Sequence, residues 1–112
     1  MNNVTKNFFD LTGGGKIKSF SGRPKGEQLR QEWSLDSLEE DPNTHITIKV
    51  PEFIYNLGPS FLQGLFTQTI FKHNGLDLFR SKYTIEASSL ILEQINYMVE
   101  KLDRENGKPA ND

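Results

Sequence analysis

Ile46-Thr-Ile-Lys-Val50 predicts a buried β-strand, because its apolar side chains recur at the two-residue period of a strand. An irregular loop, residues 51–58, follows it and leads into Pro59-Ser-Phe-Leu62. Proline is favoured at the first position of a helix, where a missing N–H group costs nothing, so we expect a helix from Pro59 to His73. A buried strand that leads into an amphipathic helix is typical of α/β folds.

The segments around this unit extend the same pattern. Two short runs that each contain apolar side chains, residues 8–11 and 16–20, are joined by a glycine-rich turn and predict a β-hairpin. Further helices are expected at about 25–40 and 88–102, and another strand at 82–86 with a short helical turn before it. We therefore expect an α/β fold, with a small mixed sheet that includes an N-terminal β-hairpin and is flanked by about three helices.

The length of the chain indicates one domain. Its 112 residues are enough for one hydrophobic core and too few for two. We expect a single domain over residues 1–112, with a core at about 8–102 and a flexible tail at 103–112.

Composition limits the classes of function. The net charge of -2 does not favour binding to nucleic acid. No apolar run approaches the roughly 20 residues of a membrane-spanning helix, and the N-terminus lacks the apolar core of a signal peptide. The chain contains no cysteine, and His45 and His73 have no further ligands at metal-binding spacing. We expect a cytoplasmic protein that binds neither nucleic acid nor membrane and has no metal, cofactor or catalytic site.

Ser60 is the candidate modification site. It would lie in the first turn of the helix that Pro59 begins, where backbone N–H groups are unpaired and the positive end of the helix dipole faces outward. A phosphate on this hydroxyl would be well placed. The alternative is a polar residue that only fills the first helical turn.

A second candidate is a basic patch. Between residues 16 and 30 the chain carries one acid against five cations, which are Lys16, Lys18, Arg23, Lys25 and Arg30. If the hairpin and the first helix share an edge, this patch could meet phosphate or an acidic partner. The alternative is a surface that serves solubility.

Three motifs carry a resemblance to a known family. They are Gly26-Glu-Gln-Leu-Arg30, the Ile46–Val50 strand and Pro59-Ser-Phe-Leu-Gln-Gly-Leu-Phe66, in this order. Together they resemble the bacterial STAS-like domain of unknown function, which is distantly similar to anti-sigma-factor antagonists and to other STAS domains. The resemblance covers roughly residues 16–100. The chain departs from the family pattern at Lys49 and Pro51, where an acidic residue is common.

The resemblance implies a regulatory protein–protein interaction module without catalytic activity. By position, Ser60 corresponds to a serine that a partner kinase of the histidine-kinase-like ATPase type phosphorylates to switch binding off. The expected partner surface is the loop and helix start, which comprise Ile54, Tyr55, Leu57, Gly58, Pro59 and Phe61.

A different class of function stays open. The same fold could serve a small inhibitor or accessory protein, of the kind that mobile elements encode, which blocks a host enzyme or nucleoprotein. The two hypotheses differ in the partner that they require, and the sequence leaves open whether the chain forms a homo-oligomer.

Overall fold

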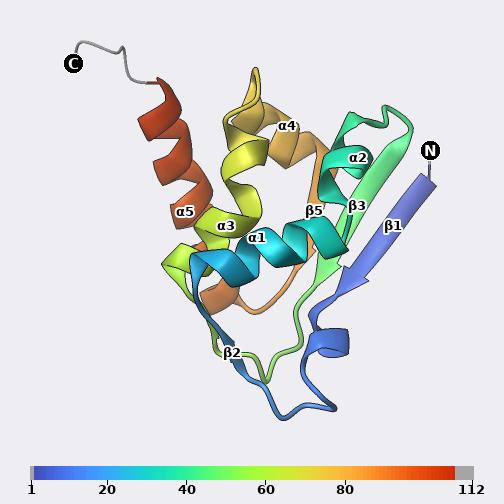
Figure 1. Cartoon of the computed structure of the whole chain (residues 1–112), viewed down its shortest axis with the longest axis vertical. Helices are drawn as coiled ribbons and strands as arrows, with labels where there is room; N and C mark the ends of the chain where they lie inside the picture. Colours follow the sequence, from blue (N-terminus) through green and yellow to red (C-terminus); the bar gives the residue numbers. More distant parts are fainter. Residues whose placement is uncertain (1, 108–112) are drawn as a thin grey trace.

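Three parallel strands form the main sheet, in the order β1–β3–β5 (Figure 1). They are β1 (Asn2–Asn7), β3 (Thr44–Lys49) and β5 (Tyr83–Glu86) in a computed structural model that describes residues 2–107. A second sheet pairs two short strands, also in parallel, β2 (Ser19–Phe20) and β4 (Asn56–Leu57). Parallel strands need crossover connections, and helices provide them here.

Five α-helices and one short 3-10 helix accompany these strands in the described part of the chain. They are η1 (Phe8–Leu11), α1 (Arg23–Glu32), α2 (Leu35–Glu40), α3 (Pro59–Ile70), α4 (Gly75–Lys82) and α5 (Ser89–Gly107). Figure 1 shows β1 at one side of the molecule and α5 at the other, with α1 and α3 between them. The core therefore lies between the sheet and the helices.

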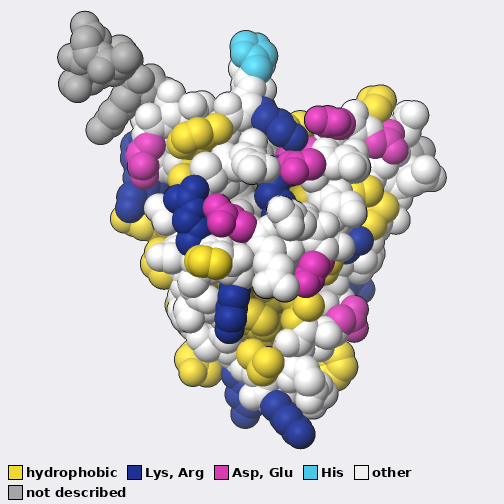
Figure 2. Space-filling model, in the orientation of Figure 1, with side chains coloured by type: hydrophobic (Ala, Val, Ile, Leu, Met, Phe, Trp, Pro, Cys, Tyr) yellow, Lys and Arg dark blue, Asp and Glu magenta, His cyan; other side chains and the backbone are white. Residues whose placement is uncertain are grey.

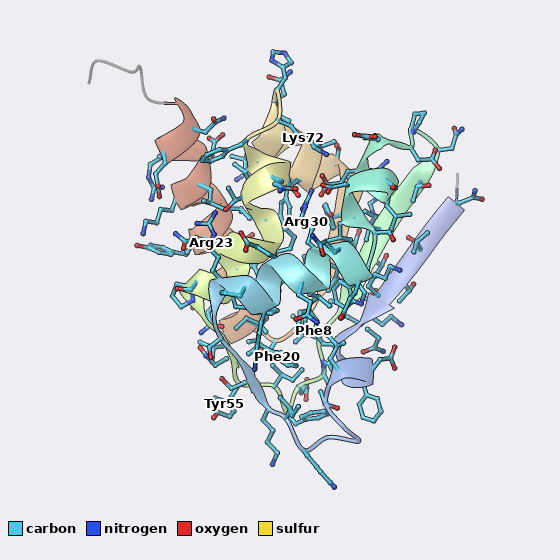
Figure 3. All side chains as sticks on the ribbon, in the orientation of Figure 1. Phe8, Phe20, Arg23, Arg30, Tyr55 and Lys72 are labelled. Atoms are coloured by element: carbon cyan, nitrogen blue, oxygen red, sulfur yellow. The ribbon has the colours of Figure 1, made fainter. Side chains whose placement is uncertain are left out.

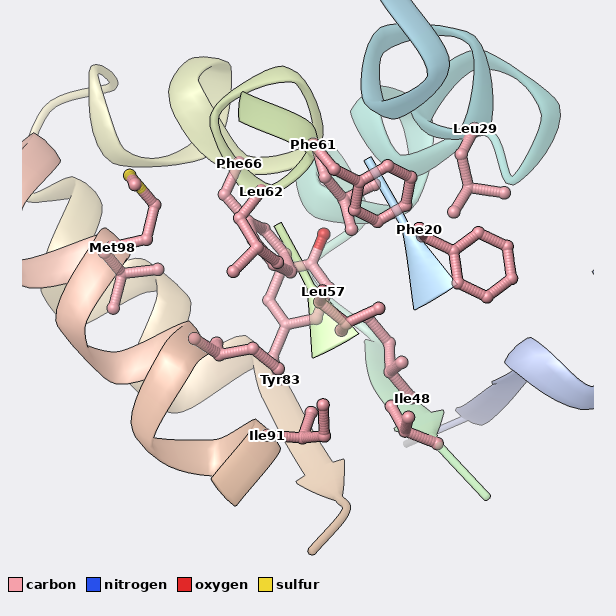
Figure 4. Packing of buried hydrophobic residues seen from close by; sticks show 14 of the residues in the cluster. Phe20, Leu29, Ile48, Leu57, Phe61, Leu62, Phe66, Tyr83, Ile91 and Met98 are labelled. Carbon is pink, nitrogen blue, oxygen red and sulfur yellow. The ribbon is translucent and has the colours of Figure 1, made fainter. Parts of the chain in front are cut away.

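Buried apolar side chains from both layers meet in one cluster (Figure 4). Ile46 and Ile48 of β3 are almost fully buried, as the alternation in the sequence predicts. Phe66 of α3 and Ile91 of α5 are equally buried. The sheet and the helices therefore share one hydrophobic core.

α1 and α3 pack closely because two glycines lie where they cross. A Cβ atom at Gly26 would overlap the carbonyl oxygen of Phe61, and one at Gly64 would overlap that of Arg23. The backbones of the two helices therefore approach more closely than other residues would permit. This contact holds the starts of α1 and α3 beside each other.

We expect Gly64→Ala to destabilise the fold by about 1–3 kcal/mol, because the added methyl group forces the two helices apart. Alanine has the higher helix propensity by about 1 kcal/mol, so propensity alone predicts the opposite sign. Urea denaturation measures the difference. Gln63→Ala, one residue earlier in α3, should stay within about 0.5 kcal/mol of the parent chain. A variant Gly64→Ala as stable as this control would contradict the close helix crossing.

Several expected elements are confirmed. The strand predicted from Ile46 to Val50 is β3, and the strand predicted at 82–86 is β5. The helix predicted to begin at Pro59 does so, although it ends at Ile70, and the helical turn expected after it is α4. The last predicted helix is α5, which continues to Gly107, so residues 103–107 are helical. The rest of the predicted tail lies outside the described residues.

The predicted N-terminal β-hairpin is wrong, and so is the mixed sheet. Residues 8–11 form η1, and β2 pairs with β4 in parallel. The glycines do form a turn, with positive φ at Gly13, Gly14 and Gly15, but the segments on either side do not pair. The hydroxyl of Thr12 closes this turn, because it accepts from the Gly15 N–H and donates to the Phe9 carbonyl.

The first predicted helix is divided in two. α1 ends at Glu32, and Ser34 adopts a left-handed conformation with φ of 55° before α2 begins. The described chain therefore has more helices than the three expected. The strand β1 was not predicted, because only Val4 within it is an apolar residue.

Candidate functional site

Ser60 lies in the first turn of α3, as predicted, and its side chain is exposed. Gly58 precedes the helix in an extended conformation and makes no side-chain cap. The first backbone bond of the helix runs from the Leu62 N–H to the Gly58 carbonyl, at 3.0 Å. The N–H groups of Ser60 and Phe61 lie before that bond and point out of the helix start.

A second helix begins beside this one. Phe20 of β2 pairs with Leu57 of β4, and the Gly58 N–H donates to the Phe20 carbonyl at 2.8 Å. Each strand then leads through a glycine, Gly22 or Gly58, into a helix with no acidic residue in its first turn. The positive ends of two helix dipoles therefore lie at the same end of the small sheet, next to Ser60.

Most of the predicted partner surface is buried. Ile54 and Leu57 are each 1% exposed and Phe61 is 2% exposed, so these side chains belong to the core. Gly58 is buried as well. The predicted partner surface is therefore not exposed at these four positions, because Ile54, Leu57 and Phe61 pack into the core. Tyr55 and Pro59 are exposed and remain candidates.

An apolar groove lies between α3 and α5 and includes the exposed Pro59. It has a volume of about 430 Å³ and is lined by Leu57, Pro59, Leu62, Leu90, Glu93, Gln94, Tyr97 and Met98. Leu90 and Tyr97 are 52% and 63% exposed, which is high for large apolar side chains. Pro59 lines the groove and immediately precedes Ser60, so the candidate modification site lies at its border. Sequence analysis missed this groove, although Leu90 and Tyr97 lie seven positions apart on one helix face.

Gln94 fixes one wall of the groove. Its side-chain oxygen accepts from the Leu57 N–H at 2.9 Å, and its side-chain nitrogen donates to the Asn56 side chain at 3.1 Å. These bonds attach α5 to β4. Because α5 is hydrogen-bonded to β4, the wall of the groove that α5 forms is held in place.

The predicted basic patch loses one member. Arg30 is only 3% exposed and points into the molecule (Figure 3). Lys16, Lys18, Arg23 and Lys25 are exposed, as predicted. Arg23 pairs with Glu27 at 3.2 Å across one turn of α1.

Arg30 instead belongs to a buried ionic network with Glu39. The Arg30 Nη2 atom lies 2.9 Å from a Glu39 carboxylate oxygen, and its Nη1 atom donates to the Leu65 carbonyl at 2.9 Å. Lys72 also pairs with Glu39, at 2.8 Å. The hydroxyls of Thr69 and Tyr83 donate to the other carboxylate oxygen. The network thus joins α1, α2, α3 and β5.

Hydrogen bonds, neighbouring charges and burial determine the protonation states of Glu39 and Tyr83 in this network. Burial would raise the pKa of Glu39, but hydrogen bonds from Lys72, Thr69 and Tyr83 and the charge of Arg30 hold it below its ordinary value. Burial and the negative charge of Glu39 raise the pKa of Tyr83 far above its ordinary value. Glu39 is therefore an ionised and fully hydrogen-bonded group, which suits a structural role and not that of a general base.

Other kinds of site find no support in residues 2–107. No group of three or more histidine or acidic side chains there is arranged to hold a metal ion. No helix within the same range combines the length and the apolar character needed to cross a membrane. Comparison with protein-family models, with curated proteins and with solved structures finds no match to the chain.

Proposed function

We propose that this protein is a non-enzymatic regulatory module of the STAS-like type, which binds another protein through the surface around Ser60. The observation that carries the proposal is the position of Ser60. It is exposed beside two helix N-termini and at the border of the apolar groove between α3 and α5. Exposed apolar side chains that line a groove are typical of protein interaction sites.

Phosphorylation of Ser60 would switch this binding off. A phosphate adds a charge of about -2, and the dipoles of α1 and α3 stabilise negative charge at this position without a change of fold. A partner that docks across Pro59 into the groove must remove water from the phosphate. That desolvation is costly, so the phosphorylated protein binds weakly. The kinase that suits this role is a partner ATPase of the histidine-kinase-like type.

We expect Ser60→Asp to weaken partner binding by about tenfold or more, equal to about 1.4 kcal/mol, and Ser60→Ala to leave it unchanged. Affinity purification with mass spectrometry first identifies the partner, and calorimetric titration then compares the variants. Thermal melts confirm that each variant is folded.

Ser81→Asp is the matched control, because Ser81 is an exposed serine on α4, away from the groove. It should bind like the parent chain. Equal affinities for the two Ser60 variants would make Ser60 a helix-start residue only. Recovery of a metabolic enzyme or nucleoprotein as the sole saturable partner would favour the inhibitor hypothesis instead.

A further inference from the structure

An apolar hollow lies beneath α1, on a different surface from the groove that borders Ser60. It has a volume of about 240 Å³ and is lined by Leu11, Ile17, Ser19, Phe20, Lys25, Gln28, Leu29, Glu32 and Phe61. Phe20, Leu29 and Phe61 are core residues, which form its floor. Ile17 is 46% exposed at its rim. The hollow therefore brings these core side chains close to the surface of the molecule.

The rim of the hollow carries unpaired positive charge. Lys25 lines it, and Lys16 and Lys18 are exposed on either side of Ile17. Within residues 2–107 none of these three lysines forms an ion pair. Figure 2 shows hydrophobic side chains below α1 with Lys and Arg side chains beside and beneath them.

One acidic group lines the hollow, and a second precedes the lining residue Leu11 in η1. Glu32 lines the hollow and accepts a hydrogen bond from Gln28 at 3.0 Å. Asp10 is exposed on η1. Three lysines against these two acids leave the rim with an excess of positive charge.

We propose that this hollow binds a short acidic segment of a partner protein, with one bulky apolar residue inserted beneath α1. The apolar floor suits a leucine or phenylalanine side chain, and the lysines suit the acidic residues on either side of it. The groove between α3 and α5 is larger, but among the described residues its charged lining consists of the acid Glu93 alone, so it does not offer the same complementarity to acids. The proposal does not depend on Ser60 and adds a second binding surface to the proposed function.

Three labelled peptides test the chemistry of the partner by fluorescence anisotropy. The first has a central leucine flanked by aspartate and glutamate, the second replaces the leucine with serine, and the third replaces the acids with asparagine and glutamine. We expect only the first to bind measurably at low salt, with a loss of about tenfold or more for each of the others. Equal binding of the first two peptides, or of single-stranded DNA, would reduce the site to non-specific charge attraction and overturn the proposal. No binding of the first peptide would overturn it too.

Two pairs of variants place the binding at the hollow. Ile17→Ser and Lys25→Glu should each weaken the first peptide by about fivefold or more. Their matched controls are Leu90→Ser in the other groove and Arg104→Glu on α5, which should leave the affinity unchanged. Lys25→Glu should remain folded, because an acidic residue is favoured in the first turn of a helix. Loss of binding in the controls and not in the hollow variants would refute the assignment. The test is separate from that of Ser60, since Ser60→Asp should bind the first peptide normally.

Discussion

Glu39→Ala is expected to cost about 3–5 kcal/mol of the free energy of unfolding, because it leaves the Arg30 guanidinium without its only fully buried carboxylate partner among the described residues. The side chain of Glu39 is fully buried, and that of Arg30 is 3% exposed, so water cannot replace the lost partner. The hydroxyls of Thr69 and Tyr83 lose their acceptor as well. Small domains have a total stability of about 5–15 kcal/mol, so chemical denaturation should show a large loss.

Asp36→Ala is the matched control, because Asp36 binds the same guanidinium, at 2.7 Å, but its side chain is 58% exposed. Exposed ion pairs contribute at most about 1 kcal/mol. We therefore expect a much smaller loss for Asp36→Ala. Equal losses for the two variants would mean that the buried carboxylate has no special structural role.

The pH dependence of stability gives a second measurement of this network. The pKa of Glu39 is lower in the folded protein than its ordinary value, since the hydrogen bonds and Arg30 outweigh the effect of burial. Its ionised form therefore stabilises the fold at all pH values above the ordinary carboxyl range. This stabilisation is lost as the pH falls through the lower pKa of the folded state. In Glu39→Gln the fall of stability in acid should be shallower, because the amide does not ionise.

The central strand and the helices were predictable because their side chains follow the periods of buried elements. β3 alternates apolar and polar residues, and Pro59 marks the start of α3 without ambiguity. β1 lacked any such signal. It lies at the edge of the sheet, where pairing with β3 through the backbone holds a strand of mostly polar residues in place.

The hairpin and the single helix at 25–40 failed for a common reason. The local sequence was compatible with a hairpin in the first case and with one continuous helix in the second. In the folded protein, contacts between residues far apart in sequence determine a different structure. β2 pairs with β4, which lies some 37 positions away in sequence, as the bond between Ser19 and Asn56 shows. The left-handed conformation of Ser34 separates α1 from α2, and α2 places Glu39 against Arg30.

The candidate site shows which features a sequence can indicate. The place of Ser60 in the first turn of a helix followed from the glycine and the proline before it, and α3 begins at that proline. The burial of Arg30 could not be predicted, because an arginine on an amphipathic helix is usually at the surface. The groove between α3 and α5 depends on the packing of two helices whose relative position no local pattern specifies.

Phe66→Ala should be the most destabilising apolar substitution in α3, with a loss of about 3–5 kcal/mol. Phe66 is 1% exposed, and its ring meets those of Phe79 and Tyr83 edge to face, at 5.1 Å and 5.8 Å between centroids. These two rings belong to α4 and β5, so Phe66 joins α3 to the edge of the sheet. Its removal leaves a cavity between α3, α4 and β5. The Glu39 network fixes α3 and β5, and this limits how far the elements can collapse. Urea denaturation of the whole chain measures the loss.

Phe71→Ala separates this packing effect from the general cost of losing a phenylalanine. Phe71 follows directly after α3 and is 48% exposed, so its truncation should cost less than about 1 kcal/mol.

The aromatic cluster and the ionic network share Tyr83, which contacts Phe66 and donates to Glu39. Phe66→Ala combined with Glu39→Ala should therefore destabilise the fold by an amount different from the sum of the two single losses. Strict additivity of the two losses would show that the aromatic cluster and the ionic network act independently. In the comparison of single variants, similar losses for Phe66→Ala and Phe71→Ala would contradict the position of Phe66 in the core.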